Sequence, residues 1–64
     1  MNYYTVLYRE QNQYTDLPFA FTCMADNVDH AEEQCYNAYP DCDIVWVVQT
    51  ANVDAAYEDY YELL

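Results

Sequence analysis

The chain has 64 residues, a length that suits one small domain. Twelve acidic residues outnumber a single arginine, Arg9, and the formal net charge at pH 7 is −11. Binding to nucleic-acid phosphates needs clusters of Lys and Arg, so we expect no direct contact with DNA or RNA, and none with anionic membranes. Apolar residues make up 55% of the chain, and this content excludes a disordered acidic tail.

The three cysteines, Cys23, Cys35 and Cys42, are odd in number and widely spaced, which makes a poor disulfide framework. The first residues have neither the basic region nor the long apolar stretch of a signal peptide. No run approaches the roughly 18 apolar residues of a membrane helix. We therefore expect free thiols and a reducing compartment, the cytoplasm.

The first part of the chain predicts two strands. β-Branched and aromatic residues alternate between two faces in residues 3–9, and a similar alternation recurs in residues 19–25. The polar segment between them suits a long hairpin loop. The chain has no glycine, so tight turns that need a positive φ must use Asn or Asp or give way to longer loops.

The next segment predicts a helix that begins after an N-cap at Asp26 or Asn27 and stops at Pro40. Spacings of three and four residues define one apolar stripe on this helix, made of Val28, Ala31, Cys35 and Ala38 or Tyr39. The residues expected to face solvent are His30, Glu32, Glu33 and Asn37.

Residues 44–48 form the run with the strongest strand preference in the chain. This run is apolar on both faces, which predicts a strand that is buried on both sides or offers one face to a partner. Asn52 can cap a last helix over residues 53–64. Its apolar and aromatic face comprises Val53, Ala56, Tyr57, Tyr60, Tyr61 and Leu64, and its acidic face comprises Asp54, Glu58, Asp59 and Glu62.

The order strand, strand, helix, strand, helix predicts an α+β fold with a three-stranded antiparallel sheet. A right-handed crossover through the first helix makes the second and third strands parallel. The first strand then lies between them, antiparallel to both, which gives the strand order 2-1-3. The first helix covers one face of the sheet. The C-terminal helix covers part of the other face or swaps onto a neighbouring chain.

Catalytic, metal and cofactor sites are poorly supported by the residues present. The chain has no Cys-x-x-Cys pair, and His30 lies on a different side of its helix from Cys35. The acidic run from Asp26 to Glu32 lacks the glycine and the ligand spacing of a calcium loop. A phosphate-binding loop needs glycine and lysine, and the chain has neither. We expect no enzyme activity and no cofactor.

The acidic surface and the tyrosines remain as candidates for a binding surface. Rows of carboxylates on the two helices either keep the domain soluble or imitate spaced phosphates for a protein with a basic groove. Tyrosine is enriched at interfaces because it joins an apolar ring to a hydroxyl. The candidate protein-binding residues are therefore Trp46, Asp54, Tyr57, Glu58, Asp59, Tyr60, Tyr61 and Glu62.

The run Ala25-Asp26-Asn27-Val28-Asp29-His30-Ala31 follows the predicted hairpin and precedes Tyr39-Pro40 and a β-run. This order, over about residues 3–49, resembles the small podoviral gene-two proteins, which bind and inhibit bacterial RNA polymerase. The chain is also similar to short acidic early proteins of phages that infect marine cyanobacteria. The inhibitor family relies on arginines of its third strand, whereas residues 44–49 contain none.

Three functions follow as hypotheses. The first is a phage-type protein that acts in the host cytoplasm. It binds a host protein with a basic surface, a nucleic-acid-binding machine such as RNA polymerase, and inhibits or modulates it. The second is a DNA-mimic inhibitor of a host defence nuclease. The third is a structural or assembly module whose tyrosine-rich helix builds a homo-oligomer, such as a homodimer. Salt weakens charge-driven binding far more than aromatic packing, so salt dependence separates the third from the others.

Overall fold

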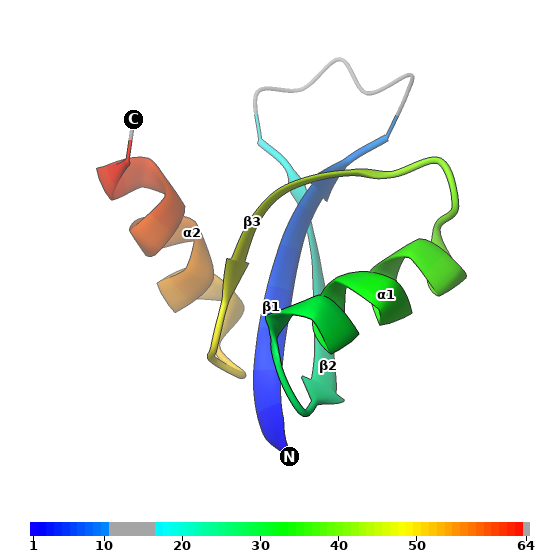
Figure 1. Cartoon of the computed structure of the whole chain (residues 1–64). Coiled ribbons are helices and arrows are strands. Elements are labelled where there is room, and N and C mark those ends of the chain that lie inside the picture. The colour runs from blue at the N-terminus through cyan, green and yellow to red at the C-terminus, as the bar shows by residue number, and fades with distance from the viewer. Residues whose placement is uncertain (11–16, 64) are drawn as a thin grey trace.

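The computed structural model describes residues 1–10 and 17–63 and has the predicted α+β fold (Figure 1). Its elements are β1 (Asn2–Arg9), β2 (Phe19–Ala25), α1 (Val28–Ala38), β3 (Asp43–Val48) and α2 (Val53–Glu62). The strands form one sheet in the predicted order β2-β1-β3, with β1 antiparallel to both neighbours. Most of the predicted hairpin loop (residues 11–16) and Leu64 lie outside the described residues.

The central strand β1 is buried on both of its faces. Tyr4, Val6 and Tyr8 enter the core beneath α1, while Thr5 and Leu7 point to the opposite face and are both 0% exposed. The rest of the core beneath α1 consists of buried Ala25, Ala31, Cys35 and Cys42, with half-buried Phe21, Cys23, Ile44 and Val47 packed against it. The strand alternation predicted for residues 3–9 is therefore confirmed.

Helix α2 packs on the sheet of its own chain, against β1 and β3 (Figure 1). Its buried residue is Ala56, which is small enough to let the helix approach the sheet closely. The sequence left two positions open for this helix, and the structure selects the free face of the sheet. The two helices thus sandwich β1, and this explains why Leu7 is inaccessible.

The hydroxyl of Thr5 joins three segments in the layer beneath α2. It donates a hydrogen bond to the carbonyl oxygen of Thr50, in the β3–α2 connection, at 2.9 Å. It also lies 3.0 Å from the hydroxyl of Thr22 on β2. Since a hydroxyl has only one hydrogen, Thr22 is the donor in this second bond. This buried polar group is therefore fully satisfied while it connects β2, β1 and the start of α2.

A β-bulge in β3 decides which of its side chains face each helix. Leu7 pairs with Trp46 and Tyr8 pairs with Ile44, so Val45 is an extra residue opposite the Leu7–Tyr8 step. The extra residue places Ile44 in the core beneath α1 together with Val47, while Trp46 faces α2. Simple alternation would have placed Ile44 and Trp46 on the same face.

Asparagine side chains cap both helices. Oδ1 of Asn27 accepts a hydrogen bond from the backbone N–H of His30 at 2.8 Å, and Oδ1 of Asn52 accepts one from that of Asp54 at 3.0 Å. Helix α1 ends at Ala38, two residues before Pro40, as predicted. No described residue has a positive φ, in keeping with a chain that has no glycine.

The predicted apolar stripe of α1 is buried only at its centre, at Ala31 and Cys35. Val28 is 45% exposed because it begins the helix at the margin of the sheet, and Ala38 and Tyr39 are also exposed at the other end. The ring of Tyr39 nevertheless stacks on Tyr8, with 5.0 Å between the ring centroids.

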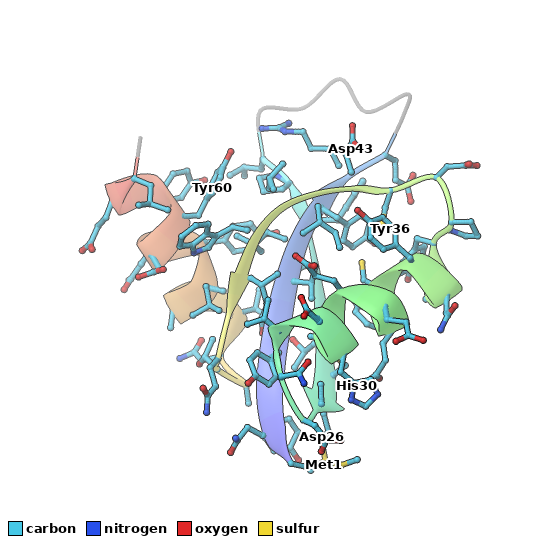
Figure 2. The ribbon with its side chains drawn as sticks, in the orientation of Figure 1. Met1, Asp26, His30, Tyr36, Asp43 and Tyr60 are labelled. Carbon is cyan, nitrogen blue, oxygen red and sulfur yellow. The ribbon has the colours of Figure 1, made fainter. Side chains whose placement is uncertain are left out.

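Two residues of α1 that the sequence assigned to solvent are half-buried, namely His30 and Glu32. His30 is held at the start of the helix, where its Nδ1 accepts the backbone N–H of Asp26 at 3.1 Å (Figure 2). Glu32 lies beside the edge of the sheet. His30 is therefore covered by the segment before the helix and Glu32 by β3, and helix periodicity shows neither.

We expect stability to fall in alkali because unfolding releases protons from buried groups. The pKa of Tyr8 is raised mainly by burial and secondly by the neighbouring Tyr39. The pKa of Cys35 is raised to about 12, mainly by burial and secondly by Cys42. The protonated forms favour the folded chain, so this contribution is intact below the ordinary pKa of 9.0 for Cys and 10.0 for Tyr and is lost above them. Urea unfolding between about pH 8 and pH 11 measures the slope of the free energy of unfolding against pH. Tyr8→Phe should flatten it, whereas Tyr3→Phe, at an exposed position, should leave it unchanged; equal slopes would contradict the assignment.

Candidate functional site

The candidate site surrounds the outer edge of β3. Within the described part of the chain, β3 pairs with β1 alone, so its other edge is open to a partner. The five apolar residues of the strand, 44–48, are all half-buried. Helices α1 and α2 flank the strand on its two sides (Figure 1). An accessible apolar edge strand is a template for pairing with another chain.

A shallow groove of about 240 Å³ lies between the start of α1 and β3. Its lining is mostly apolar and consists of Val28, Glu32, Ile44, Val45, Trp46 and Val47. Pockets for small molecules are usually about 300–1,000 Å³ and enclose most of the ligand. The size and open form of this groove therefore suit one or two side chains of a protein partner better than a substrate.

Trp46 connects β3 to α2. Its indole Nε1 donates a hydrogen bond to Oδ2 of Asp59 at 2.8 Å. The sequence grouped Asp59 with the carboxylates of the acidic face, and Asp59 is exposed in the structure, but its carboxylate also bonds to Trp46 on the sheet. Successive helix residues are about 100° apart, so Asp59 lies next to the inward-facing Tyr60 and reaches β3.

The three tyrosines of α2 do not share one environment, contrary to the predicted continuous face. Tyr57 and Tyr60 are half-buried, whereas Tyr61 is 49% exposed and Val53 is 37% exposed. The hydroxyl of Tyr57 donates to the carbonyl oxygen of Pro18 at 2.6 Å. Burial, and to a lesser extent Tyr61, raises the pKa of Tyr57. Because the buried stripe is centred on Ala56 and Tyr60, Tyr61 turns away from the sheet.

Both helices that flank β3 carry carboxylates. Asp54, Glu58 and Glu62 are exposed on α2, and Glu32 of α1 lines the groove. On the outer surface of α1, Asp29 and Glu33 are also exposed. Arg9, the single basic side chain besides His30, belongs to β1, and its Cα partner is Asp43 at the start of β3. Two carboxylates therefore lie at β3 itself, Glu32 of α1 in the groove and Asp59 of α2 on Trp46, and the others lie on the exposed surfaces of the flanking helices.

The described residues offer little to other kinds of site. Among residues 1–10 and 17–63, no group of three or more His, Cys, Asp and Glu side chains is placed to hold a metal ion. In the same residues, no helix combines the length and apolarity needed to cross a membrane. All three cysteines are free thiols. Comparison of the chain with family models, curated proteins and solved structures finds no match.

The structure divides the eight predicted binding residues into two sets. The first set comprises Trp46 and Asp59, which join β3 to α2, Tyr57, which bonds to Pro18 just before β2, and Tyr60, which is half-buried. Asp54, Glu58, Tyr61 and Glu62 form the outer surface of α2. Sequence reasoning missed the groove residues Val28, Glu32 and Val45. A spacing of four residues makes Val28 and Glu32 neighbours on the helix surface, but the sequence assigned Glu32 to solvent, and only the tertiary structure shows that β3 lies beside both.

The Tyr57 hydroxyl should stabilise the fold, and Tyr61 provides the matched control. Tyr57→Phe removes the donor to Pro18 and leaves a buried carbonyl oxygen without it, so we expect a loss of about 1 kcal/mol in the free energy of unfolding. Tyr61→Phe, on the same helix but exposed, should change that free energy by less than about 0.5 kcal/mol. Chemical denaturation measures the free energy of unfolding of both variants. Equal losses of this free energy would show that the Tyr57–Pro18 hydrogen bond does not stabilise the fold.

Proposed function

We propose that this chain is a small binding protein that acts by stoichiometric contact on a protein with a basic surface, and that it uses the open edge of β3 and the acidic surface of α2. The observation that carries the proposal is the position of β3. Its half-buried apolar edge is accessible, and it lies between two helices that carry exposed carboxylates.

The charge of the chain favours a basic partner over a second copy of itself. Each copy has a net charge of −11, so bringing two β3 edges together would place the acidic surfaces of both copies close to one another. The tyrosine-rich face that would have built a homodimer is partly used within the chain, where Tyr57 and Tyr60 are half-buried. The homo-oligomeric hypothesis is therefore less well supported.

A protein that itself binds nucleic acid is the partner class with the right chemistry. Such proteins hold Lys and Arg in grooves that neutralise phosphates. The exposed carboxylates Asp54, Glu58 and Glu62 follow one another along α2 at intervals of four residues, which presents a row of negative charges to such a groove. Inhibition would then result from occupation of the groove, and RNA polymerase and defence nucleases are both members of this class.

The charge contribution is tested with two double variants that remove the same net charge. Glu58→Gln with Glu62→Gln should weaken binding by about twofold to thirtyfold, since exposed ion pairs contribute about 0.2–1 kcal/mol each. Asp29→Asn with Glu33→Gln, on the outer surface of α1, should have a smaller effect. Calorimetric titration against purified proteins with basic channels, bacterial RNA polymerase among them, is made at about 50 and 200 mM salt.

Duplex DNA should compete with the chain for the partner. The chain itself should not bind duplex DNA, so it should not change the mobility of the DNA in a gel. Failure to bind any protein of this class, or binding that salt leaves unchanged, would overturn the proposed function. Equal weakening by the two double variants would overturn the assignment of the contact to α2.

The groove is tested by one substitution at two equivalent positions. Val28 and Val53 are each the first residue of a helix, and they are 45% and 37% exposed, so Lys should affect folding to a similar extent at both. Val28→Lys places an ammonium group in the groove, opposite a basic partner, and should weaken binding more than Val53→Lys. Equal affinities of the two variants would show that the groove is not part of the contact.

A further inference from the structure

Two cysteines from different elements meet in the core beneath α1. Cys35 lies in the last turns of α1, and Cys42 directly precedes β3. Their Sγ atoms are 3.6 Å apart. Both side chains belong to the buried core, with Cys35 0% and Cys42 6% exposed. Neither the fold nor the proposed binding surface requires two thiols in direct contact.

We propose that Cys35 and Cys42 form a modification site, at which oxidising conditions convert the two thiols into an intramolecular disulfide. A disulfide bond is about 2.05 Å long, so the sulfur atoms need to approach by only about 1.5 Å. The intervening residues, 36–41, already turn the chain so that the end of α1 faces the start of β3. This proposal is independent of the function proposed above.

The reaction balances with a small disulfide, such as oxidised glutathione, as the oxidant. The Cys42 sulfur, as its thiolate, attacks one sulfur of the oxidant, whose S–S bond breaks and releases one glutathione thiol. The Cys35 sulfur then attacks the Cys42 sulfur of the mixed disulfide and displaces the second glutathione thiol. The protein loses two protons and two electrons, and the oxidant becomes two thiols.

Burial determines how the two cysteines share these steps. Burial, and next the contact with Cys42, raises the pKa of Cys35 to about 12, so its thiolate is scarce in neutral solution. Cys42 retains a small exposed area and adjoins Asp41, which is exposed. Cys42 is therefore the first to react, and Cys35 completes the bond because it already touches Cys42.

The disulfide would join the end of α1 to the start of β3, the two elements that border the groove. Such a cross-link restricts the unfolded chain more than the folded chain, because the folded chain already holds the two sulfurs together. In a domain of this size, the closed loop should raise the melting temperature by roughly 10 °C.

The experiment treats the full chain with excess oxidised glutathione at about pH 8.5 and follows mass, linkage and melting temperature. The expected product is a monomer that is lighter by about 2 Da, with the disulfide mapped to Cys35 and Cys42 by proteolysis and mass spectrometry without reduction. Reductant should restore the original mass and melting temperature.

Cys23→Ala provides the control because Cys23 is half-buried on β2 and has no place in the proposed bond. This variant should still lose about 2 Da and gain the same increase in melting temperature. Cys42→Ser should do neither. A bond that involves Cys23, a cross-linked dimer, or a parent chain that remains unmodified after prolonged oxidation would overturn the proposal, and linkage mapping of the parent decides this even if a variant fails to fold.

Discussion

The structure depends on the burial of β1 on both of its faces. A chain of 64 residues has little apolar surface to bury, and the central strand is used twice, once beneath each helix. Tyr4, Val6 and Tyr8 form the centre of one layer, and Thr5 and Leu7 the centre of the other. If either helix left the sheet, one face of β1 would meet water, so the two layers are mutually dependent.

This use of β1 leaves β3 as an edge strand with two environments. The bulge at Val45 allows β3 to contribute Ile44 and Val47 to one layer and Trp46 to the other. The hydrogen bond from Trp46 to Asp59 then joins the outer layer to the strand. Since both helices are occupied in covering β1, neither covers the outer edge of β3, and the groove beside Val28 is the result.

Charge and packing act on different parts of the molecule. The carboxylates are concentrated on the outer surfaces of the helices and in the connections, where water solvates them, and Thr5 is the one buried polar residue among those that the structure describes. The excess of eleven negative charges costs stability through mutual repulsion, which a basic partner would relieve. A basic partner would therefore stabilise the chain as well as bind it, by mass action.

The sequence predicts the elements, their order and the strand arrangement, because alternation, helix spacing, a cap at Asp26 or Asn27, the cap Asn52 and Pro40 are local features. It also indicated Trp46 and α2 as parts of one surface. Only the tertiary structure shows where α2 packs and which of its tyrosines are half-buried. It alone shows that Asp59 accepts a hydrogen bond from Trp46. It alone placed Cys35 against Cys42 and formed the groove of Val28 and Glu32. These contacts join segments that are distant in the chain or separated by a turn, so local patterns do not contain them. The bulge at Val45 also shifts the register of β3, and no local pattern shows this shift.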